Sequence, residues 1–317
     1  MKAAVVQAFD GPPQYQDFPV PALLDGERLV TTTAAALSQL VRLQAAGKHY
    51  SGGTPPFVPG ADGVGRLDDG QRVYFAFPRP PVGAMAEFVA VQDALTVPLP
   101  ADLDDVTAAA IANPGMSSWA ALTERSTFKP GSGVLINGAT GASGRLAIQI
   151  ARHLGAGRIV TTGRDAGAEP ALRALGADAF IPLGQPQHEL IRAFRPEMQG
   201  QVDVVLDYLW GPSAEALIAA AASPVTGDAA HSVQFINMGS IAGATISLPA
   251  SPMRSSGLCL MGSGLGSVSH SALVRAISAM FAVVRSAGLS IDVAPVPLSK
   301  VETAWTSQTK ARVVLTF

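Results

Sequence analysis

Strand-like and helix-like patterns alternate along the second part of the chain, from about residue 116. Short runs of β-branched and other apolar residues are each followed by a longer stretch of helix-forming residues. The predicted strands are 134–137, 159–162, 179–181, 202–206, 234–238 and 258–261, and the predicted helices include 170–175, 189–195 and 214–222. Because such alternation is typical of a parallel sheet covered on both faces, this part is predicted to be a doubly wound α/β domain.

The first part of the chain has a different rhythm. Short strand candidates are separated by clusters of proline and glycine, and one helix, at about 38–46, interrupts them and ends at Gly47. The strand candidates are 5–6, 29–32, 63–67, 72–75 and 87–91. A helix near 270–286 and a strand at 312–317 close the chain. We expect a compact β-rich domain made of residues 1–115 and 265–317, and an α/β domain made of residues 116–264.

The strongest local signal is a glycine-rich turn between a strand and a helix. Val134–Asn137 lead into the turn, and Leu146 and Ile150 form an apolar helical stripe after it. Strand, glycine turn and helix in this order are typical of the phosphate-binding corner of a dinucleotide-binding fold, here with the pattern A-x-G-x-x-G. The residues expected to bind the cofactor are Gly138, Ala139, Thr140, Gly141, Ala142, Ser143 and Gly144.

Each glycine of this turn has an expected task. Gly141 lets a pyrophosphate approach the backbone, and Gly144 lets the helix press against the strand. The N–H groups of the first helical turn would face the phosphates, at the positive end of the helix dipole. The alternative is an ordinary tight turn between a strand and a helix.

Composition narrows the class of protein. The chain has 317 residues, of which 48% are hydrophobic and 15% charged, as expected of a well-buried globular protein. The net charge of -2, without basic clusters, gives no reason to expect nucleic acid or an anionic membrane as a partner. The single cysteine, Cys259, excludes intramolecular disulfides and cysteine-rich zinc sites, and its apolar neighbours predict a core thiol. With no signal-peptide pattern and no apolar run long enough for a membrane span, a cytoplasmic protein is expected.

Four motifs spread over the chain carry a family resemblance. They are Met1-Lys2-Ala3-Ala4-Val5, Pro59-Gly60-Ala61-Asp62-Gly63-Val64-Gly65, Lys129-Pro130-Gly131-Ser132-Gly133-Val134-Leu135-Ile136 and Arg312-Val313-Val314-Leu315. With them the chain resembles the medium-chain dehydrogenase/reductase superfamily, and within it the zinc-independent quinone oxidoreductase branch. The resemblance implies a GroES-like β-rich catalytic domain beside a Rossmann domain. It also implies hydride transfer from NADPH to a quinone or to an α,β-unsaturated carbonyl compound.

The resemblance bears on the metal question. Zinc-dependent relatives place a cysteine in the segment that aligns with Ala36-Leu37-Ser38 and a histidine in the position taken by Ala61. Both ligand types are missing here, and the five histidines lack ligand spacing. A catalytic zinc is therefore not expected. Without a Lewis acid, alcohol oxidation lacks a means of stabilising the alkoxide, whereas reduction of an electron-poor acceptor stays feasible.

Candidate catalytic residues are few. Ser38, His49 and Tyr50 fall in the segment that lines the substrate cleft in the relatives, and Ser38 and Tyr50 are our candidates for hydrogen bonding to the substrate. Quinone reductases usually carry asparagine where this chain has Ser38, which weakens the substrate assignment. A packing role for these side chains is an equal alternative, and water can also supply the proton.

The ends of three other strands complete the predicted cofactor site. The second strand ends at Gly163-Arg164-Asp165, where an arginine suits a 2′-phosphate and an acidic residue suits a ribose hydroxyl. Arg164 favours NADP(H), and a solvated loop arginine is the alternative. Met238, Gly239 and Ser240 follow the fifth strand, and Gly262–Gly266 follow the sixth. Asn113–Trp119 are expected at the domain junction, with Trp119 in the core.

Three functions remain open at this point. They are a metal-free NADPH-dependent reductase of quinones or unsaturated carbonyls, a zinc-free alcohol or aldehyde dehydrogenase, and a catalytically silent NADPH-binding sensor. The expected partner is a small electrophilic substrate. A homodimer is expected as well, since relatives pair their cofactor-domain sheets edge to edge, and Ala244–Leu248 is the predicted edge strand.

Overall fold

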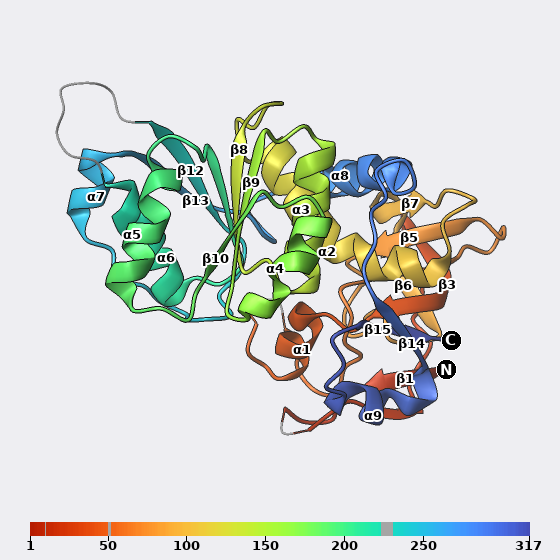
Figure 1. Cartoon of the computed structure of the whole chain (residues 1–317). Coiled ribbons are helices and arrows are strands. Elements are labelled where there is room, and N and C mark those ends of the chain that lie inside the picture. Colours follow the sequence, from red (N-terminus) through yellow and green to blue (C-terminus); the bar gives the residue numbers. More distant parts are fainter. Residues whose placement is uncertain (10, 50–51, 223–230) are drawn as a thin grey trace. The chain divides into compact units, whose positions relative to one another are not determined.

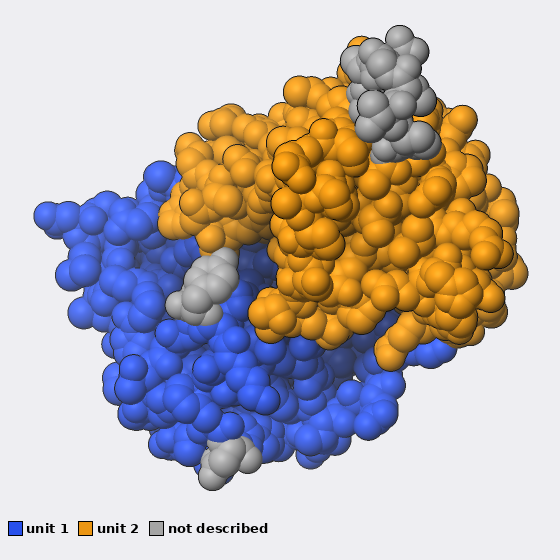
Figure 2. All heavy atoms as spheres, turned by 90° about the vertical axis from the view of Figure 1, so that its left-hand side faces the viewer, with its two compact units in different colours: residues 1–113, 277–284, 290–317 blue, residues 114–276, 285–289 orange. Residues whose placement is uncertain are grey.

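The computed structural model describes residues 1–9, 11–49, 52–222 and 231–317. The chain divides into two compact units, which Figure 2 shows in different colours. Unit 1 consists of residues 1–113, 277–284 and 290–317, and unit 2 of residues 114–276 and 285–289. The boundaries expected from the sequence, 1–115 with 265–317 and 116–264, describe domains and stay a prediction.

Unit 2 is built on one parallel sheet of six strands in the order β10-β9-β8-β11-β12-β13. The strands are β8 (Gly133–Asn137), β9 (Arg158–Gly163), β10 (Ala179–Pro182), β11 (Val204–Asp207), β12 (Ser232–Asn237) and β13 (Gly257–Gly262). Numbered along the chain from β8, this is the order 3-2-1-4-5-6 of a dinucleotide-binding fold. The carboxyl ends of β8 and β11 lie side by side at the point where the order reverses, which is where ligands bind in such sheets.

Helices alternate with these strands. They are α3 (Ala142–His153), α4 (Glu169–Ala174), α5 (Gln187–Met198), α6 (Gly211–Ala221) and α7 (Ala250–Ser255). Figure 1 shows α5 and α6 next to each other, and their apolar side chains share one core with the sheet, in which Phe194 of α5 and Phe235 of β12 are fully buried. The buried stripe of α3 includes Leu146 and Ile150, as the helical spacing predicted.

Unit 1 is β-rich. Its main sheet runs in the order β14-β15-β3-β4-β5-β7, with β6 paired to β3, and every pairing except that of β14 with β15 is antiparallel. The strands of this unit are β1 (Lys2–Val5), β2 (Gln14–Asp17), β3 (Glu27–Ala36), β4 (Asp62–Arg66), β5 (Arg72–Ala76), β6 (Phe88–Gln92), β7 (Thr96–Pro98), β14 (Val293–Pro297) and β15 (Arg312–Thr316). Two short helices, α1 (Gln39–Ala45) and α9 (Val301–Thr306), lie among them in the sequence. The expected β-rich plus α/β architecture is confirmed.

Two longer helices carry the chain from one unit to the other. They are α2 (Asp105–Glu124) and α8 (His270–Val283). The sequence predicted α8 but not α2. Ala108–Ala112 of α2 are all buried, so the helix has no polar face to reveal a helical period, and Pro114 lies inside it.

Two expectations for the edge of the parallel sheet are wrong. Ala244–Leu248 do not form a strand, because the Ser247 N–H group donates to the carboxylate of Glu215 (2.7 Å) and not to a neighbouring strand. The edge strand beyond β12 is β13. Cys259 is exposed and not in the core, because it lies on this edge strand, with its side chain on the face opposite to that of buried Leu258.

In the part of the chain that the structure describes, none of the helices is both long and apolar enough to cross a membrane.

Candidate functional site: a nucleotide-binding turn at the ends of the parallel strands

The glycine turn follows β8 directly and is held by the neighbouring strand β9. Gly138 has a φ of 93°, which a residue with a side chain rarely adopts, and its N–H group donates to the Thr162 hydroxyl (2.9 Å). The Ala139 N–H group donates to the carbonyl oxygen of Thr162 (2.9 Å). A Cβ atom at Gly138 would lie 2.8 Å from Leu209. The contacts with Thr162 of β9 and with Leu209 therefore fix the conformation of the first residues of the turn.

Gly141 and Gly144 differ in their surroundings. A Cβ atom on Gly144 would lie 2.4 Å from the Cα atom of Ala139, so the absence of a side chain permits the close packing of α3 on the turn. A Cβ atom on Gly141 would meet nothing within 4 Å. The open space beside Gly141 is what the approach of a phosphate group to the backbone requires, so the turn fits the pyrophosphate of a dinucleotide.

The start of α3 provides the hydrogen-bond donors. Gly141 is the N-cap residue and accepts from the Arg145 N–H group (3.0 Å), while the N–H groups of Ala142, Ser143 and Gly144 have no acceptor within the helix. The Arg145 side chain donates to the carbonyl oxygen of Thr140 (3.2 Å) and adds a positive charge beside the turn. Donors, helix dipole and arginine charge all favour an anion at this position.

Arg164 and Asp165 follow β9 and are the two candidates for contacting the 2′ position of a bound cofactor, and the structure distinguishes between them. A Cβ atom at Gly163 would lie 2.6 Å from the Thr140 side chain, so the two loops touch at this point. The Asp165 carboxylate accepts from the Gly167 N–H group (3.0 Å) and caps a short 3₁₀ helix. Arg164 is exposed, and the described residues offer its side chain neither a hydrogen bond nor an ion pair. Arg164 is thus the candidate that remains available to a ligand.

Below these loops lies a polar network that the sequence did not predict. Asn137, at the end of β8, donates through Nδ2 to Asp207 Oδ1 (2.8 Å) and to the Ser213 hydroxyl (2.9 Å). Its Oδ1 atom accepts from the Thr162 hydroxyl (2.7 Å). Asn237, at the end of β12, donates to Asp207 Oδ2 (3.2 Å). The network ties together the carboxyl ends of four parallel strands.

Asp207 is the centre of this network. Its carboxylate also accepts from the N–H groups of Leu209 and Trp210, each at 3.1 Å. Burial raises the pKa of Asp207, and the hydrogen bonds from Asn137, Trp210, Leu209 and Asn237 act in the opposite direction. These bonds hold the loop after β11, in which Trp210 has a φ of 59°.

The residues predicted after β12 lie beside this loop. The Met238 N–H group donates to the carbonyl oxygen of Asp207 (2.7 Å), and Asn237 Nδ2 donates to the carbonyl oxygen of Gly239 (2.8 Å). A Cβ atom at Gly239 would lie 2.7 Å from the carbonyl oxygen of Tyr208. Ser240 follows as an exposed residue. The structure thus brings Met238, Gly239 and the end of β11 together.

The candidate catalytic residues belong to unit 1. Ser38 is buried, and its hydroxyl accepts from the Val41 N–H group (3.1 Å) as the N-cap of α1. Burial lowers the pKa of His49. Tyr50 lies outside the described residues. The catalytic role of Ser38 and Tyr50 stays a prediction, and the observed task of Ser38 is to cap a helix.

Unit 1 also holds a buried carboxyl group in the Pro59–Gly65 motif. Asp62 is fully enclosed and accepts from the Tyr74 hydroxyl (3.2 Å). Burial raises the pKa of Asp62 to about 6, against the effects of Arg312 and Tyr74. Within the described residues, no group of three histidine, cysteine, aspartate or glutamate side chains is placed to hold a metal ion.

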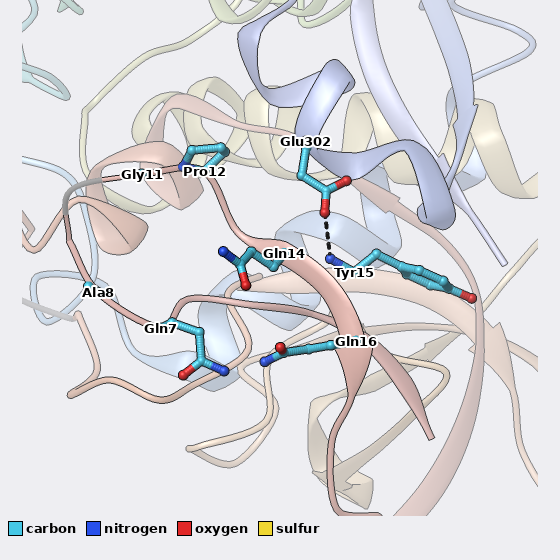
Figure 3. Close-up of a pocket in the computed structure, with 8 residues that line it drawn as sticks. All are labelled: Gln7, Ala8, Gly11, Pro12, Gln14, Tyr15, Gln16 and Glu302. Carbon is cyan, nitrogen blue, oxygen red and sulfur yellow. Dashed lines mark hydrogen bonds between the residues drawn. The ribbon is translucent and has the colours of Figure 1, made fainter.

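A pocket of about 370 Å³ lies in unit 1, and it is lined by residues between Gln7 and Gln16 and by Glu302. Figure 3 shows Gln7, Gln14 and Gln16 around it, and the Tyr15 N–H group donating to Glu302 Oε1 (2.9 Å). It contains none of the residues that the sequence assigned to cofactor or substrate.

Comparisons with known proteins agree with this geometry. No protein-family model matches the chain. A probable NADPH-dependent quinone reductase of Emericella nidulans is 29% identical over 96% of each chain. A 2-haloacrylate reductase of Burkholderia is 31% identical over 65% of each chain. The solved quinone oxidoreductase of Thermus thermophilus, also studied in complex with NADPH, is 27% identical over the full length of both chains, with a TM-score of 0.80.

The chain is thus similar over its whole length to quinone reductases, and it resembles the quinone oxidoreductase-like branch of the medium-chain dehydrogenase/reductase superfamily. The fold is shared with a mycobacterial quinone oxidoreductase as well, with a TM-score of 0.86 at 22% identity over 100% of both chains. The superfamily resemblance that the four motifs predicted is confirmed.

Proposed function

We propose that this chain is an NADPH-dependent reductase that transfers hydride to a quinone or to an α,β-unsaturated carbonyl compound without a metal ion. The observation that carries the proposal is the glycine turn of unit 2, in which Gly141 leaves open space beside the free N–H groups of α3. The names of the relatives, which are quinone and acrylate reductases, support the same reaction.

When it is bound, NADPH supplies the hydride, and the protein supplies binding and orientation. In the proposal, the first turn of α3 holds the pyrophosphate, and Arg164 holds the 2′-phosphate of the adenosine. The Asp207 network keeps the loops after β8, β11 and β12 in one arrangement. Hydride adds to the electron-poor carbon of the acceptor, and a proton from water completes the reduction.

A direct assay tests this function against its alternatives. Oxidation of NADPH is followed with a panel of small quinones and enones, and NADPH binding is measured separately by equilibrium titration. We expect binding and turnover with at least one acceptor of these two classes. Binding without turnover would favour a silent NADPH-binding sensor. Turnover of simple alcohols or aldehydes alone would favour a zinc-free dehydrogenase.

The acceptor is proposed to be a small electrophilic molecule, reduced without zinc. The metal-free part of the proposal rests on Ser38 and Ala61, which stand where zinc-dependent relatives have cysteine and histidine. Neither the buried hydroxyl of Ser38, already used as a helix cap, nor the methyl group of Ala61 is a zinc ligand.

A homodimer is also proposed, now through β13. This strand lies at the edge of the parallel sheet, and in the described residues no further strand covers its outer side. An exposed strand edge favours pairing with a second copy. Light scattering at micromolar concentration should give twice the chain mass of 32.5 kDa, and the monomer mass would contradict the proposal. The cytoplasmic location stays a proposal too, and cell fractionation tests it.

A further inference from the structure

Arg312, the first residue of β15, carries a guanidinium group that is largely covered but not paired. Its Nε and Nη2 atoms are buried and have no hydrogen-bond partner in the part of the chain that the structure describes. The third nitrogen, Nη1, is not closed off, and the residue as a whole is half-buried, so a ligand can reach the group from that side. A desolvated charge without a partner is costly, and an anion would offset this cost.

The strand register places Arg312 and Asp62 on one face of the main sheet of unit 1. Side chains two residues apart along a strand point to the same side, and so do residues that pair across two strands. Arg312 is two residues from Val314, and Asp62 is two residues from Val64. The pairings that relate these positions are Val314 with Ala36 between β15 and β3, and Ala34 with Val64 between β3 and β4.

Arg42 of α1 brings a second guanidinium group close to the first. Its Nη1 atom donates to the carbonyl oxygen of Trp305, and its Cζ atom lies 5.5 Å from the centroid of the Trp305 ring. These contacts hold the group in place, while its Nε and Nη2 atoms have no partner among the described residues. Burial lowers the pKa of both arginines; Asp62 raises that of Arg312, and Arg42 lowers it further. The two like charges thus lie near enough to repel each other.

The charges that meet here do not balance. Arg42 and Arg312 are positive, and an ionised Asp62 compensates only one of them. Within the described residues Asp62 forms an ion pair with neither arginine, and its carboxylate accepts from the Tyr74 hydroxyl (3.2 Å). A monoanion would restore the balance. A carboxylate is the monoanion that matches the planar N–H groups of guanidinium best.

The two arginines flank the segment in which the acceptor is expected. Arg42 lies one helical turn after Ser38, and its N–H group donates to the Ser38 carbonyl oxygen (3.0 Å). The Leu37 N–H group donates to the carbonyl oxygen of Val313, the residue after Arg312 (2.9 Å). Since Ser38 is our candidate for hydrogen bonding to the substrate, an anion held by the arginines would belong to the substrate.

We propose that Arg42 and Arg312 bind a carboxylate of the acceptor, so that this chain reduces α,β-unsaturated acids in preference to their neutral derivatives. The inference rests on the proposed function and narrows its substrate class. Hydride from NADPH forms the new C–H bond at the β-carbon, the electron pair of the double bond takes a proton from water at the α-carbon, and NADP⁺ and hydroxide are left. Pairing of the carboxylate with guanidinium favours this step, because it withdraws electron density from the double bond.

The first test measures binding without reduction. Butyrate and hexanoate, saturated acids without a double bond to reduce, and their neutral amides are titrated into the natural protein, Arg312→Gln and Arg42→Gln at constant ionic strength in chloride. We expect the natural protein to bind the acids more tightly than the amides, and each variant to bind the acids roughly tenfold more weakly. Melting temperatures show which variants are folded, and two variants are made so that one can replace the other. Equal affinity of the natural protein for acids and amides would overturn the inference.

The second test compares turnover of crotonate with that of its neutral methyl ester, followed by NADPH oxidation. The ratio of the two kcat/KM values, acid over ester, should fall roughly tenfold in each arginine variant, mainly through KM. Arg28→Gln is the matched control, because Arg28 is a unit 1 arginine already paired with Asp68 (2.7 Å), and it should leave acid binding unchanged. An unchanged ratio in folded arginine variants would contradict the inference. Arginine-dependent binding of butyrate without NADPH oxidation by any acceptor would instead contradict the proposed function and leave the anion site in place.

Discussion

A Cβ atom on Gly144 would lie 2.4 Å from the Cα atom of Ala139, so helix α3 and the glycine turn are in direct backbone contact. Gly141, three residues earlier in the same turn, has open space at the corresponding position. One glycine is therefore required by the packing of the protein itself, and the other by the proposed ligand. The difference can be measured, because the same substitution should have different effects at the two positions.

Gly144→Ala should destabilise the ligand-free protein by about 1–3 kcal/mol, the usual cost of forcing an extra methyl group into a packed site. Gly141→Ala should leave the melting temperature nearly unchanged, because its φ of -80° suits alanine and the methyl group meets no atom. It should nevertheless weaken NADPH binding by roughly tenfold, about the loss of one hydrogen bond to a charged group. Thermal unfolding and equilibrium titration of both variants check these outcomes. A stable Gly141→Ala variant with full affinity would mean that no phosphate approaches the turn there.

Asp62 should make stability depend on pH in a definite direction. Burial raises the pKa of this carboxyl group in the folded state from its ordinary value of 3.8 to about 6, so the folded protein holds the proton more tightly than the unfolded chain. The free energy of unfolding is then highest below 3.8 and falls as the pH rises toward about 6. The difference between the two pKa values corresponds to about 3 kcal/mol.

Urea unfolding of the natural protein and of Asp62→Asn, measured from about pH 4 to pH 7, isolates this effect. Relative to the variant, the natural protein should lose most of this difference, about 2 kcal/mol, between pH 4 and pH 7, since asparagine can still accept from Tyr74 but does not ionise. The comparison includes the attraction between Asp62 and Arg312, which acts against the rise of the Asp62 pKa and is absent in the variant. A difference independent of pH would show that Asp62 titrates as an ordinary surface carboxylate.

The sequence predicted the strands of the parallel sheet well, because each is an apolar run bounded by glycine, proline or polar residues. It missed α2 for a physical reason. Ala108, Ala109, Ala110, Ile111 and Ala112 are all buried, so the periodic exchange of polar and apolar residues that reveals a surface helix is missing there. At 244–248 the error is the reverse, because the sequence has a strand pattern and the structure has no strand. Its residues alternate as in a strand, but the Glu215 carboxylate takes the N–H group of Ser247.

For the candidate site, the sequence predicted the glycine turn but not the hydrogen-bond network around Asp207. The residues of the glycine turn are contiguous, and their order alone predicts the turn. Asn137, Thr162, Asp207 and Asn237 are far apart in the sequence, and only the strand order brings them together. One signal could have found them, since each lies at or next to the predicted end of a parallel strand.

The metal-free proposal predicts that the purified protein contains no stoichiometric zinc and keeps its reductase activity after treatment with a chelator. The reason is the ligand set, since Ser38 and Ala61 replace the cysteine and histidine of zinc-dependent relatives and the only cysteine, Cys259, is in β13 of unit 2. Elemental analysis before and after dialysis checks the metal, and the NADPH oxidation assay checks the activity. About one tightly held zinc ion per chain, lost together with activity, would contradict the proposal.

Arg164 should decide the preference for NADPH over NADH. Its side chain is exposed at the end of β9 and has no partner in the described parts of the chain, whereas the neighbouring Asp165 carboxylate is engaged by the Gly167 N–H group. Hydrogen bonds from a guanidinium to a phosphate contribute roughly 1.5–3 kcal/mol, so Arg164→Ala should weaken NADPH binding by roughly ten- to a hundredfold. NADH has no phosphate at this position, and its affinity should hardly change.

The matched control for this experiment is Arg173→Ala. Arg173 lies on the following helix, α4, and is already paired with Glu169 (2.8 Å), so its removal should leave the affinities for both cofactors unchanged. Titration of each variant with NADPH and NADH gives the ratio of the two dissociation constants directly. If Arg164→Ala leaves this ratio unchanged, the 2′-phosphate is not held by Arg164. Asp165 would then have to leave its cap and accept from a ribose hydroxyl, as in an enzyme that uses NADH.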